Sequence, residues 1–473
     1  MVSVIFSFDV EDFITPEADD AALRWAQLLA KHGVKGCFCV VGEKARVLRE
    51  RGRVDVIKAL KQHEIGYHSD THSLHPTMAE YLEELDWNEG VDEVIRREIK
   101  GIHDVAEIFG QYPTAWIRPG NSWAPQVMVA MALLGIPVAG DSDFEMPDGT
   151  PMRYCNSLLL RYLFAFDDYF EERDRLPRIK RDFERLVAER DRGVIVIYSH
   201  PCRLVTERFW DGLFNCGATP PKKDWRPAPL RSLEVSQKML ADFDRFIGYV
   251  VEKPNVKVTT FGELHNAYRE TEGIWLELPT VIALVKRIRD PLSYQVVEGV
   301  AFSPAEIFGL LAWSLASFSR KGKLPAYVPL RRIIGPVCLP SSPTDSFKVA
   351  IRDFLSGCCQ VEDYICEFRR IPGEIRIGEA EVGPGAFMDT MGRLLVSLDG
   401  CKEPSDHISI EPKSDYPEIA GSKDFEGLKY EGSWPVFPQD FKGERLIQMA
   451  KLQSWSTKPA LGQGNSSCQE NLK

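Results

Sequence analysis

Residues 2–12 read Val-Ser-Val-Ile-Phe-Ser-Phe-Asp-Val-Glu-Asp, an apolar run that ends in a group of carboxylates. The run lacks a basic leader and leads directly into acidic residues, so we interpret it as a buried strand and not as a signal peptide. A parallel strand that is covered on both faces reads as a continuous apolar run of this kind. In parallel α/β barrels the active site gathers at the carboxyl ends of the strands, where these acids lie.

Six further short apolar runs follow, and stretches with helical periodicity separate them. The runs cover residues 36–42, 64–68, 115–118, 137–141, 194–199 and 256–260. Alternation of short strands with helices is typical of βαβ units and of a parallel sheet. The sequence therefore predicts an α/β fold, a distorted (β/α) barrel with about seven parallel strands.

The chain has 473 residues, which exceeds what one hydrophobic core usually organises. Beyond about residue 273 the strand runs weaken, and the segments around Val297–Pro304 and Ile377–Pro384 resemble each other at a spacing near 80 residues. This similarity indicates either two related subdomains or two unrelated helices that each start at a proline. We predict a barrel domain at 1–272, a C-terminal α+β accessory domain at 273–461 and a disordered tail at 462–473.

The composition narrows the class of partner. Lys and Arg number 58 against 69 Asp and Glu, a net charge of -11, which does not favour nucleic acid. The longest apolar stretch, 304–318, is too short and too polar to span a membrane. Eleven cysteines without a CxxC pair fit reduced thiols better than a disulfide framework. We expect a cytoplasmic protein without a membrane span; its oligomeric state is left open, with a dimer through the C-terminal domain as one option.

Two histidines follow the third apolar run, in the segment His68-Ser69-Asp70-Thr71-His72. A catalytic zinc takes three nitrogen or oxygen ligands from the protein and leaves one position for water. Side chains two residues apart on a strand point to the same side, so Asp9 and Glu11 would both face these histidines. We predict one divalent metal ion on His68, His72 and one of these two carboxylates, while the other carboxylate stays free. Zinc is expected, and the same ligands accept cobalt, nickel or iron.

Five short motifs occur at strand ends along the first 270 residues. They are Ser7–Asp12, His63–His72, Ile117–Gly120, Gly140–Asp143 and Tyr198–Pro201. Together and in this order they resemble the motifs of the polysaccharide deacetylases, the fourth carbohydrate esterase family with its NodB-homology domain. Two details depart from the common pattern: Val10 separates the first two acids, and Pro201 follows the last histidine where an acid is usual.

The resemblance implies a metal triad at Glu11, His68 and His72 and four catalytic side chains. These four are the general base Asp9, Arg118 that orients it, the general acid His200, and Asp141 that pairs with His200. The alternation of side chains also favours Glu11 as the carboxylate ligand, with Asp12 as the alternative. The implied reaction is metal-dependent removal of N-acetyl groups from the amino sugars of a polysaccharide, an oligosaccharide or a glycan precursor.

Two other functions are compatible with the same fold. One is an allantoinase-like hydrolase of a small cyclic amide or imide, which the retention of both histidines disfavours. The other is a carbohydrate-binding protein on an inactive barrel, which the complete set of catalytic residues disfavours.

The aromatic residues near the motifs could either stack on sugars or belong to the core; they are Trp116, Trp123, Phe144 and Trp210. The charged run 167–192 is interpreted as a solvated helical face.

Overall fold

The computed structural model describes residues 1–142, 144–172, 174–190, 193–214, 217–271, 273–341, 343–400, 405–418, 430, 434 and 437–462, without the side chain of Asp141. The chain forms two compact units. The first comprises Met1–Pro151, Ser157–Ala267 and Glu426–Leu446, and the second Met152–Asn156, Tyr268–Phe425 and Ile447–Lys473. The domain boundaries 1–272 and 273–461 stay a prediction, and the predicted tail lies outside the described residues except for Gly462.

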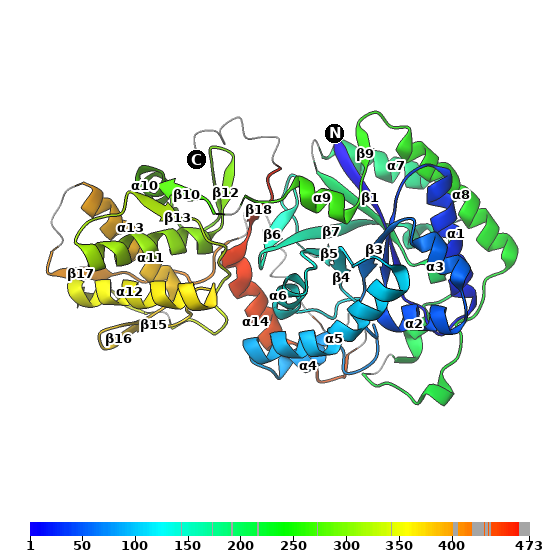
Figure 1. Cartoon of the computed structure of the whole chain (residues 1–473), viewed down its shortest axis with the longest axis horizontal. Helices are drawn as coiled ribbons and strands as arrows, with labels where there is room; N and C mark the ends of the chain where they lie inside the picture. The colour runs from blue at the N-terminus through cyan, green and yellow to red at the C-terminus, as the bar shows by residue number, and fades with distance from the viewer. Residues whose placement is uncertain are drawn as a thin grey trace. The chain divides into compact units, whose positions relative to one another are not determined.

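Within the described part of the first unit, seven parallel strands close into a ring (Figure 1), which confirms the predicted α/β barrel. In ring order the strands are β1 (Val2–Val10), β2 (Cys37–Val40), β3 (Glu64–Tyr67), β4 (Ala115–Ile117), β5 (Val138–Ser142), β7 (Ser157–Ala165) and β8 (Val194–Ser199). Because all seven run in the same direction, their carboxyl ends meet at one rim of the barrel.

The membership of this ring differs from the seven predicted runs at one strand. The predicted run 256–260 is β9 (Val256–Val258), which pairs with the start of β1 at Val2–Val4 and takes no part in closing the ring. The closing strand is β7, whose sequence the exposed Arg161 interrupts. That polar residue hides the strand from a search for continuous apolar runs.

Helices surround the ring (Figure 1). They are α1 (Glu17–Lys31), α2 (Gly42–Glu50), α3 (Val54–Leu60), α4 (Met78–Glu83), α5 (Trp87–Phe109), α6 (Pro125–Leu133), α7 (Arg175–Ala188), α8 (Leu233–Val251) and α9 (Phe261–Ala267). The long α5 begins with a capping box formed by Asp86 and Glu89 and ends at Gly110 in the left-handed conformation. None of the helices in the described part of the chain is long and apolar enough to cross a membrane.

The second unit contains two segments with the same order of elements. The first is β10 (Trp275–Glu277), α10 (Leu278–Val285), the hairpin β11 (Gln295–Val297) and β12 (Val300–Phe302), α11 (Pro304–Lys321) and β13 (Tyr327–Pro329). The second is β14 (Phe347–Ala350), α12 (Ile351–Phe368), the hairpin β15 (Ile375–Ile377) and β16 (Ala380–Val382), α13 (Pro384–Asp399) and β17 (His407–Ile410).

The registers of these two segments also match. The outermost pair of the first hairpin is Gln295 with Phe302. The outermost pair of the second hairpin is Ile375 with Val382, at a spacing of 80 residues. The outer strands pair β10 with β13 and β14 with β17. The other strands are β6 (Met152–Tyr154) and its partner β18 (Lys458–Pro459), and the last α-helix is α14 (Glu444–Leu452). These small sheets and helices give the C-terminal region the predicted α+β character.

Candidate active site

A buried cluster of Glu11, His68 and His72 lies at the carboxyl rim of the barrel. Glu11 follows β1, and His68 follows β3. The Nε2 atom of His72 lies 3.0 Å from Glu11 Oε2, and that of His68 lies 3.4 Å from the same oxygen. All three side chains are buried, and their ligand atoms lie within 4.8 Å of one another. Two imidazoles and a carboxylate at this spacing can hold one metal ion.

The other ring nitrogens of the two histidines fix the tautomers. His68 Nδ1 lies 3.0 Å from the carbonyl oxygen of Ile117, so it carries the proton that it donates there. His72 Nδ1 lies 2.5 Å from Ser73 Oγ, and the Ser73 hydroxyl donates in turn to Asp211 Oδ2. Both Nε2 atoms are therefore left with a lone pair that faces Glu11.

The electrostatics of the cluster fit a bound cation. His68 Nε2 is buried and forms no hydrogen bond with a described residue. Burial raises the pKa of Glu11, but the neighbouring imidazoles of His72, His200 and His68 lower it overall to well below the usual value. The second oxygen of Glu11, Oε1, accepts a hydrogen bond of 3.0 Å from Trp210 Nε1. An ionised carboxylate that faces two nitrogen lone pairs fits a divalent ion.

The loop that carries both histidines is held by helix α5. Ser69 and His72 have φ angles of 66° and 53°, so the backbone turns twice through the left-handed region and directs both rings to one side. The buried carboxyl group of Glu98 accepts hydrogen bonds from Asp70 N at 2.9 Å and from Tyr67 Oη at 2.7 Å. Glu98 thus holds the loop at Asp70, between the two histidines.

Asp12, the alternative carboxylate, has another role in the structure. Its Oδ1 accepts hydrogen bonds from the backbone N–H groups of Ile14 and Thr15, at 2.9 and 2.8 Å. It therefore closes the turn that follows β1. The carboxylate in the histidine cluster is that of Glu11.

A second group of charged side chains lies on the same rim. His200, directly after β8, places Nδ1 2.5 Å from Asp167 Oδ2 and Nε2 3.8 Å from Asp9 Oδ2. Burial lowers the pKa of His200, but the carboxylates of Asp167, Glu11 and Asp9 raise it to about 10. His200 is consequently a protonated imidazole between two aspartates at neutral pH.

The remaining predicted site residues lie at the ends of β4 and β5. Arg118 directly follows β4, and its NH1 group donates to Asn121 Oδ1 at 3.3 Å. Asp141 lies in β5, and its side chain is outside the described structure. Of the nearby aromatic residues, Trp116, Trp123 and Phe144 are at most 2% exposed, so they belong to the core.

Three contributors to the site were missed from the sequence. Asp167 follows the unrecognised strand β7, and Asp211 lies in the short helix Trp210–Phe214. Trp434 Nε1 donates to Asp211 Oδ2 at 3.1 Å, and its carbonyl oxygen accepts a hydrogen bond from Asn121 N. The sequence signal for Asp167 was an acid shortly after a strand that one polar residue, Arg161, interrupts. No local signal pointed to Asp211 or Trp434.

An open pocket of about 560 Å³ lies beside this rim. Aromatic and basic side chains line it, among them Phe209, Trp210, Trp434, Arg203, Arg208 and Arg226. The ring of Phe209 meets that of His200 edge-on at 4.9 Å. A molecule in this pocket would therefore lie close to the His200 imidazole.

Comparisons with known proteins give likenesses of fold. Neither a protein-family model nor a curated protein matches the chain. A solved structure from Mycobacterium smegmatis, assigned to the polysaccharide deacetylases, is 19% identical with a TM-score of 0.36, over 56% of this chain and 88% of that one. The PuuE allantoinase is 15% identical with a TM-score of 0.39, over 57% and 92%. A pseudoenzyme of carbohydrate esterase family 4 from Bacillus anthracis is 15% identical with a TM-score of 0.31, over 55% and 64%.

Proposed function

We propose that this protein is a metal-dependent hydrolase that removes N-acetyl groups from the amino sugars of a polysaccharide, an oligosaccharide or a glycan precursor. The observation that carries the proposal is the convergence of His68 Nε2 and His72 Nε2 on one carboxylate oxygen of Glu11. Beside this cluster His200 lies between Asp9 and Asp167. Amide hydrolysis of this kind uses a metal ion, a general base and a general acid.

Glu11, His68 and His72 would hold the metal ion, for which zinc is expected and cobalt, nickel or iron are alternatives. When bound there, a divalent ion would supply polarisation of the amide carbonyl group and a lowered pKa for a water molecule. The hydrogen bonds from His68 to Ile117, from His72 to Ser73 and from Trp210 to Glu11 would keep the three ligands in orientation.

We assign the proton transfers to Asp9 and His200. Asp9 takes the proton of the attacking water, and we propose that Arg118 orients Asp9. An amine leaves only when it is protonated, so His200 donates its Nε2 proton to the departing nitrogen. Asp167, on the Nδ1 side of His200, stabilises the charged imidazole. We therefore give Asp167 the pairing role for which the sequence motif pointed to Asp141.

The test compares wild type with His68→Ala for bound metal and for acetate release from N-acetylglucosamine oligomers. We expect about one metal ion per chain in the wild type and the loss of both metal and acetate release in the variant. His103→Ala is the matched control, because His103 is an exposed histidine on α5 outside the cluster. The control should keep both properties.

Two other results would redirect the assignment. Metal without acetate release would keep the site and point to a cyclic amide or imide as substrate. Absence of metal after incubation with zinc, cobalt, nickel and iron would contradict the ligand set and favour a carbohydrate-binding protein on an inactive barrel.

A further inference from the structure

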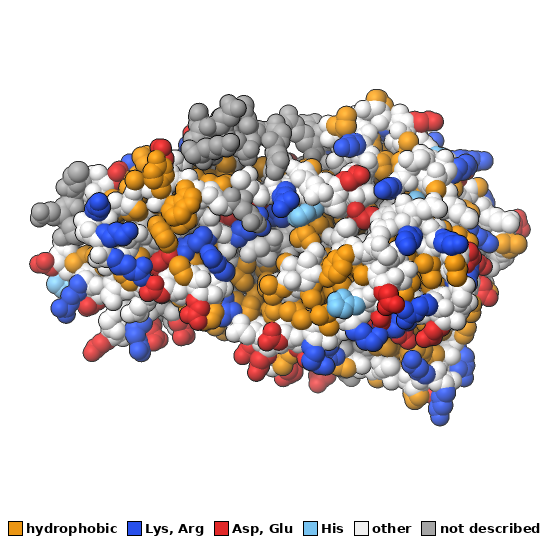
Figure 2. Space-filling view, in the orientation of Figure 1, with side chains coloured by type: hydrophobic (Ala, Val, Ile, Leu, Met, Phe, Trp, Pro, Cys, Tyr) orange, Lys and Arg blue, Asp and Glu red, His pale blue; other side chains and the backbone are white. Residues whose placement is uncertain are grey.

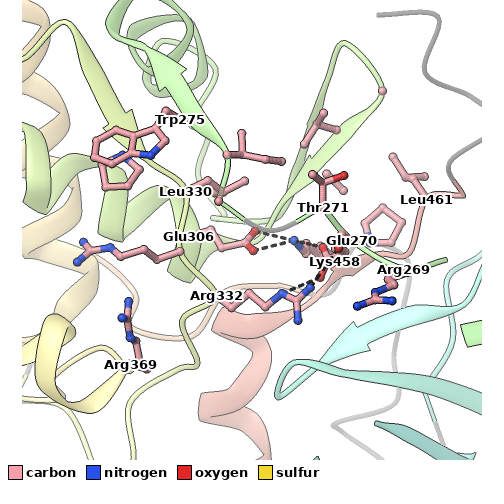
Figure 3. Close-up of a pocket in the computed structure, with 18 of the residues that line it drawn as sticks. Arg269, Glu270, Thr271, Trp275, Glu306, Leu330, Arg332, Arg369, Lys458 and Leu461 are labelled. Carbon is pink, nitrogen blue, oxygen red and sulfur yellow. Dashed lines mark hydrogen bonds and ion pairs between the residues drawn. The ribbon is translucent and has the colours of Figure 1, made fainter. Parts of the chain in front are cut away.

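A pocket of about 600 Å³ lies entirely within the second unit, and neither the metal cluster nor the proposed reaction uses it (Figure 3). Cavities that bind small organic molecules have volumes of about 300–1,000 Å³. Its walls come from β10, the β11–β12 hairpin, α11, β13 and β18. The wall therefore belongs mainly to the first of the two matching segments of this unit.

The lining carries more positive than negative charge. Its basic residues are Arg269, Arg331, Arg332, Arg369 and Lys458, and its acidic residues are Glu270 and Glu306. This excess of positive charge is local, because the whole chain has a net charge of -11. A cationic pocket in an acidic protein favours an anionic ligand.

Part of the charge in the pocket is already neutralised within the protein. Lys458 Nζ lies 2.7 Å from Glu306 Oε1 and 2.5 Å from Glu270 Oε1, and both Lys458 and Glu306 are at most 6% exposed. Arg331 pairs with Glu362 through two hydrogen bonds of 2.7 and 2.8 Å. These pairs form a rigid wall, since buried charges remain where their partners hold them.

Arg369 differs from these paired residues. It is exposed, it lies at the carboxyl end of α12 in the left-handed conformation at φ 54°, and it forms no ion pair with a described residue. Figure 3 shows Arg332 and Arg369 on one side of the Glu306–Lys458 pair and Trp275 on the other. A planar guanidinium suits two-point contact with a carboxylate or a phosphate.

The opposite wall is aromatic. Trp275 is 51% exposed, and its ring meets that of Trp313 edge-on at 6.1 Å. On the face shown in Figure 2, basic side chains lie beside hydrophobic ones over the elements α10–α13. A large exposed aromatic surface opposite Arg369, which forms no ion pair with a described residue, is a combination that suits a ring with an acidic substituent.

The second matching segment shows that the scaffold does not require these residues. By strand register Trp275 corresponds to Lys348, because Glu277 and Ala350 hold equivalent places. At the spacing of 80 residues Trp313 corresponds to Arg393 and Glu306 to Ala386. The same element order thus forms without the aromatic pair and without the buried glutamate. Glu306 also caps α11 through Ser303, so its presence has a structural reason. The presence of the Trp275–Trp313 pair in one segment alone points to a purpose other than folding.

Arg332, on the same side of the pocket as Arg369, is paired with Glu270 at 3.6 Å. We propose that this pocket binds a small organic anion that contains a ring, with the acidic group at Arg369 and the ring on Trp275. A sugar acid and an aromatic acid share this chemistry. The site is separate from the proposed hydrolase centre, and its occupancy does not depend on bound metal.

The test is calorimetric titration of the full-length protein with sodium glucuronate and with sodium benzoate, each up to about 10 mM. Glucose and benzyl alcohol are the uncharged counterparts, and inorganic phosphate is the anion without a ring. We expect at least one of the two acids to bind, and its uncharged counterpart to bind at least about 10-fold more weakly. The acid that binds more tightly identifies the source of the ligand.

Two variants examine the two walls. Arg369→Asn removes the charge and keeps a residue that tolerates positive φ, and Trp275→Val keeps the strand preference of β10. Each should weaken binding about 10-fold or more. The controls are Arg352→Gln and Tyr327→Val, which remove an exposed arginine and an exposed tyrosine that do not line the pocket. Thermal unfolding of every variant checks that the unit still folds.

Several outcomes would overturn the proposal. The first is the absence of binding of either acid. The second is binding that Arg369→Asn and Trp275→Val leave unchanged. The third is equal affinity for inorganic phosphate and for both acids in wild type and in Trp275→Val, because the ring would then contribute nothing.

Discussion

At the residue scale, the hydrogen bond from Trp210 to Glu11 deserves the first test. The indole Nε1 donates to Glu11 Oε1 at 3.0 Å and leaves Oε2 directed at the two histidines. In the structure the rings of Trp210 and Phe13 lie 4.5 Å apart. Trp210→Phe removes the hydrogen-bond donor and keeps an aromatic ring against Phe13. We expect metal affinity to fall about 10- to 100-fold, as measured by competition with a fluorescent chelator.

Trp225→Phe is the matched control for this prediction. Trp225 also donates its Nε1 hydrogen bond within a loop, at 3.0 Å to Pro220 O, but it does not touch the cluster. Its replacement should leave metal affinity unchanged. Equal affinities of Trp210→Phe and wild type would contradict the orienting role of the indole.

The pH dependence of catalysis should depend on Asp167. An acid catalyst must be protonated, and the pKa of His200 is raised to about 10 despite its burial, with Asp167 the strongest of the carboxylates that raise it. In Asp167→Asn the pKa of His200 falls, so the alkaline limb of the pH–kcat profile should move to lower pH. Removing the imidazole in His200→Ala should lower kcat about 10²- to 10⁴-fold.

Asp168→Asn serves as the control for this profile, because Asp168 is the neighbouring acid and His200 Nδ1 contacts Asp167 instead. Its alkaline limb should stay in place. An unchanged limb in Asp167→Asn would show that another group donates the proton.

At the scale of elements, α5 is connected to the loop of both histidines by a carboxyl group that resists ionisation. Burial raises the pKa of Glu98 to about 7 from the ordinary 4.5. A raised folded-state pKa means that its contribution to stability is complete below the unfolded value and is lost as pH rises through 7. The difference corresponds to about 3 kcal/mol.

Glu98→Gln removes this titration and keeps an oxygen that accepts the hydrogen bonds of Tyr67 and Asp70. Its free energy of unfolding relative to wild type should therefore rise between about pH 5 and pH 8, up to about 3 kcal/mol, in urea titrations at each pH. Glu107→Gln on the same helix, where Glu107 is 75% exposed, should show no such trend. A constant difference across this range would mean that Glu98 is ionised throughout.

At the scale of the whole molecule, residues from the C-terminal part of the sequence belong to the barrel unit. Tyr430 is fully buried and donates its hydroxyl hydrogen to the carbonyl oxygen of Trp123 at 2.6 Å. Tyr430→Phe leaves that carbonyl without this donor and should cost about 1–3 kcal/mol. Each kcal/mol lowers Tm by about 2–4 °C for a unit of this size.

Tyr327→Phe is the control, because Tyr327 is 55% exposed and its loss of a hydroxyl should leave Tm unchanged. Differential scanning calorimetry distinguishes the two variants. An unchanged Tm in Tyr430→Phe would mean that the segment adds no stability to the barrel.

Much of the grouping of the candidate site residues could be predicted from the sequence, because this grouping depends on local periods. The alternation of side chains along β1 puts Asp9 and Glu11 on one side, and the strand ends bring His68 and His200 to the same rim. Backbone geometry sets both patterns over a few residues. The barrel class followed from the same short-range alternation of strands and helices.

Only the tertiary structure decided which strand closes the ring and which distant residues complete the site. β7 pairs with β5 and β8, and this closure brings Asp167 to His200. Trp210 and Trp434 reach the cluster from loops whose course no short-range period describes. Contacts between residues far apart in the chain depend on how all the elements pack, so a single sequence determines the ends of its strands more directly than the partners that meet there.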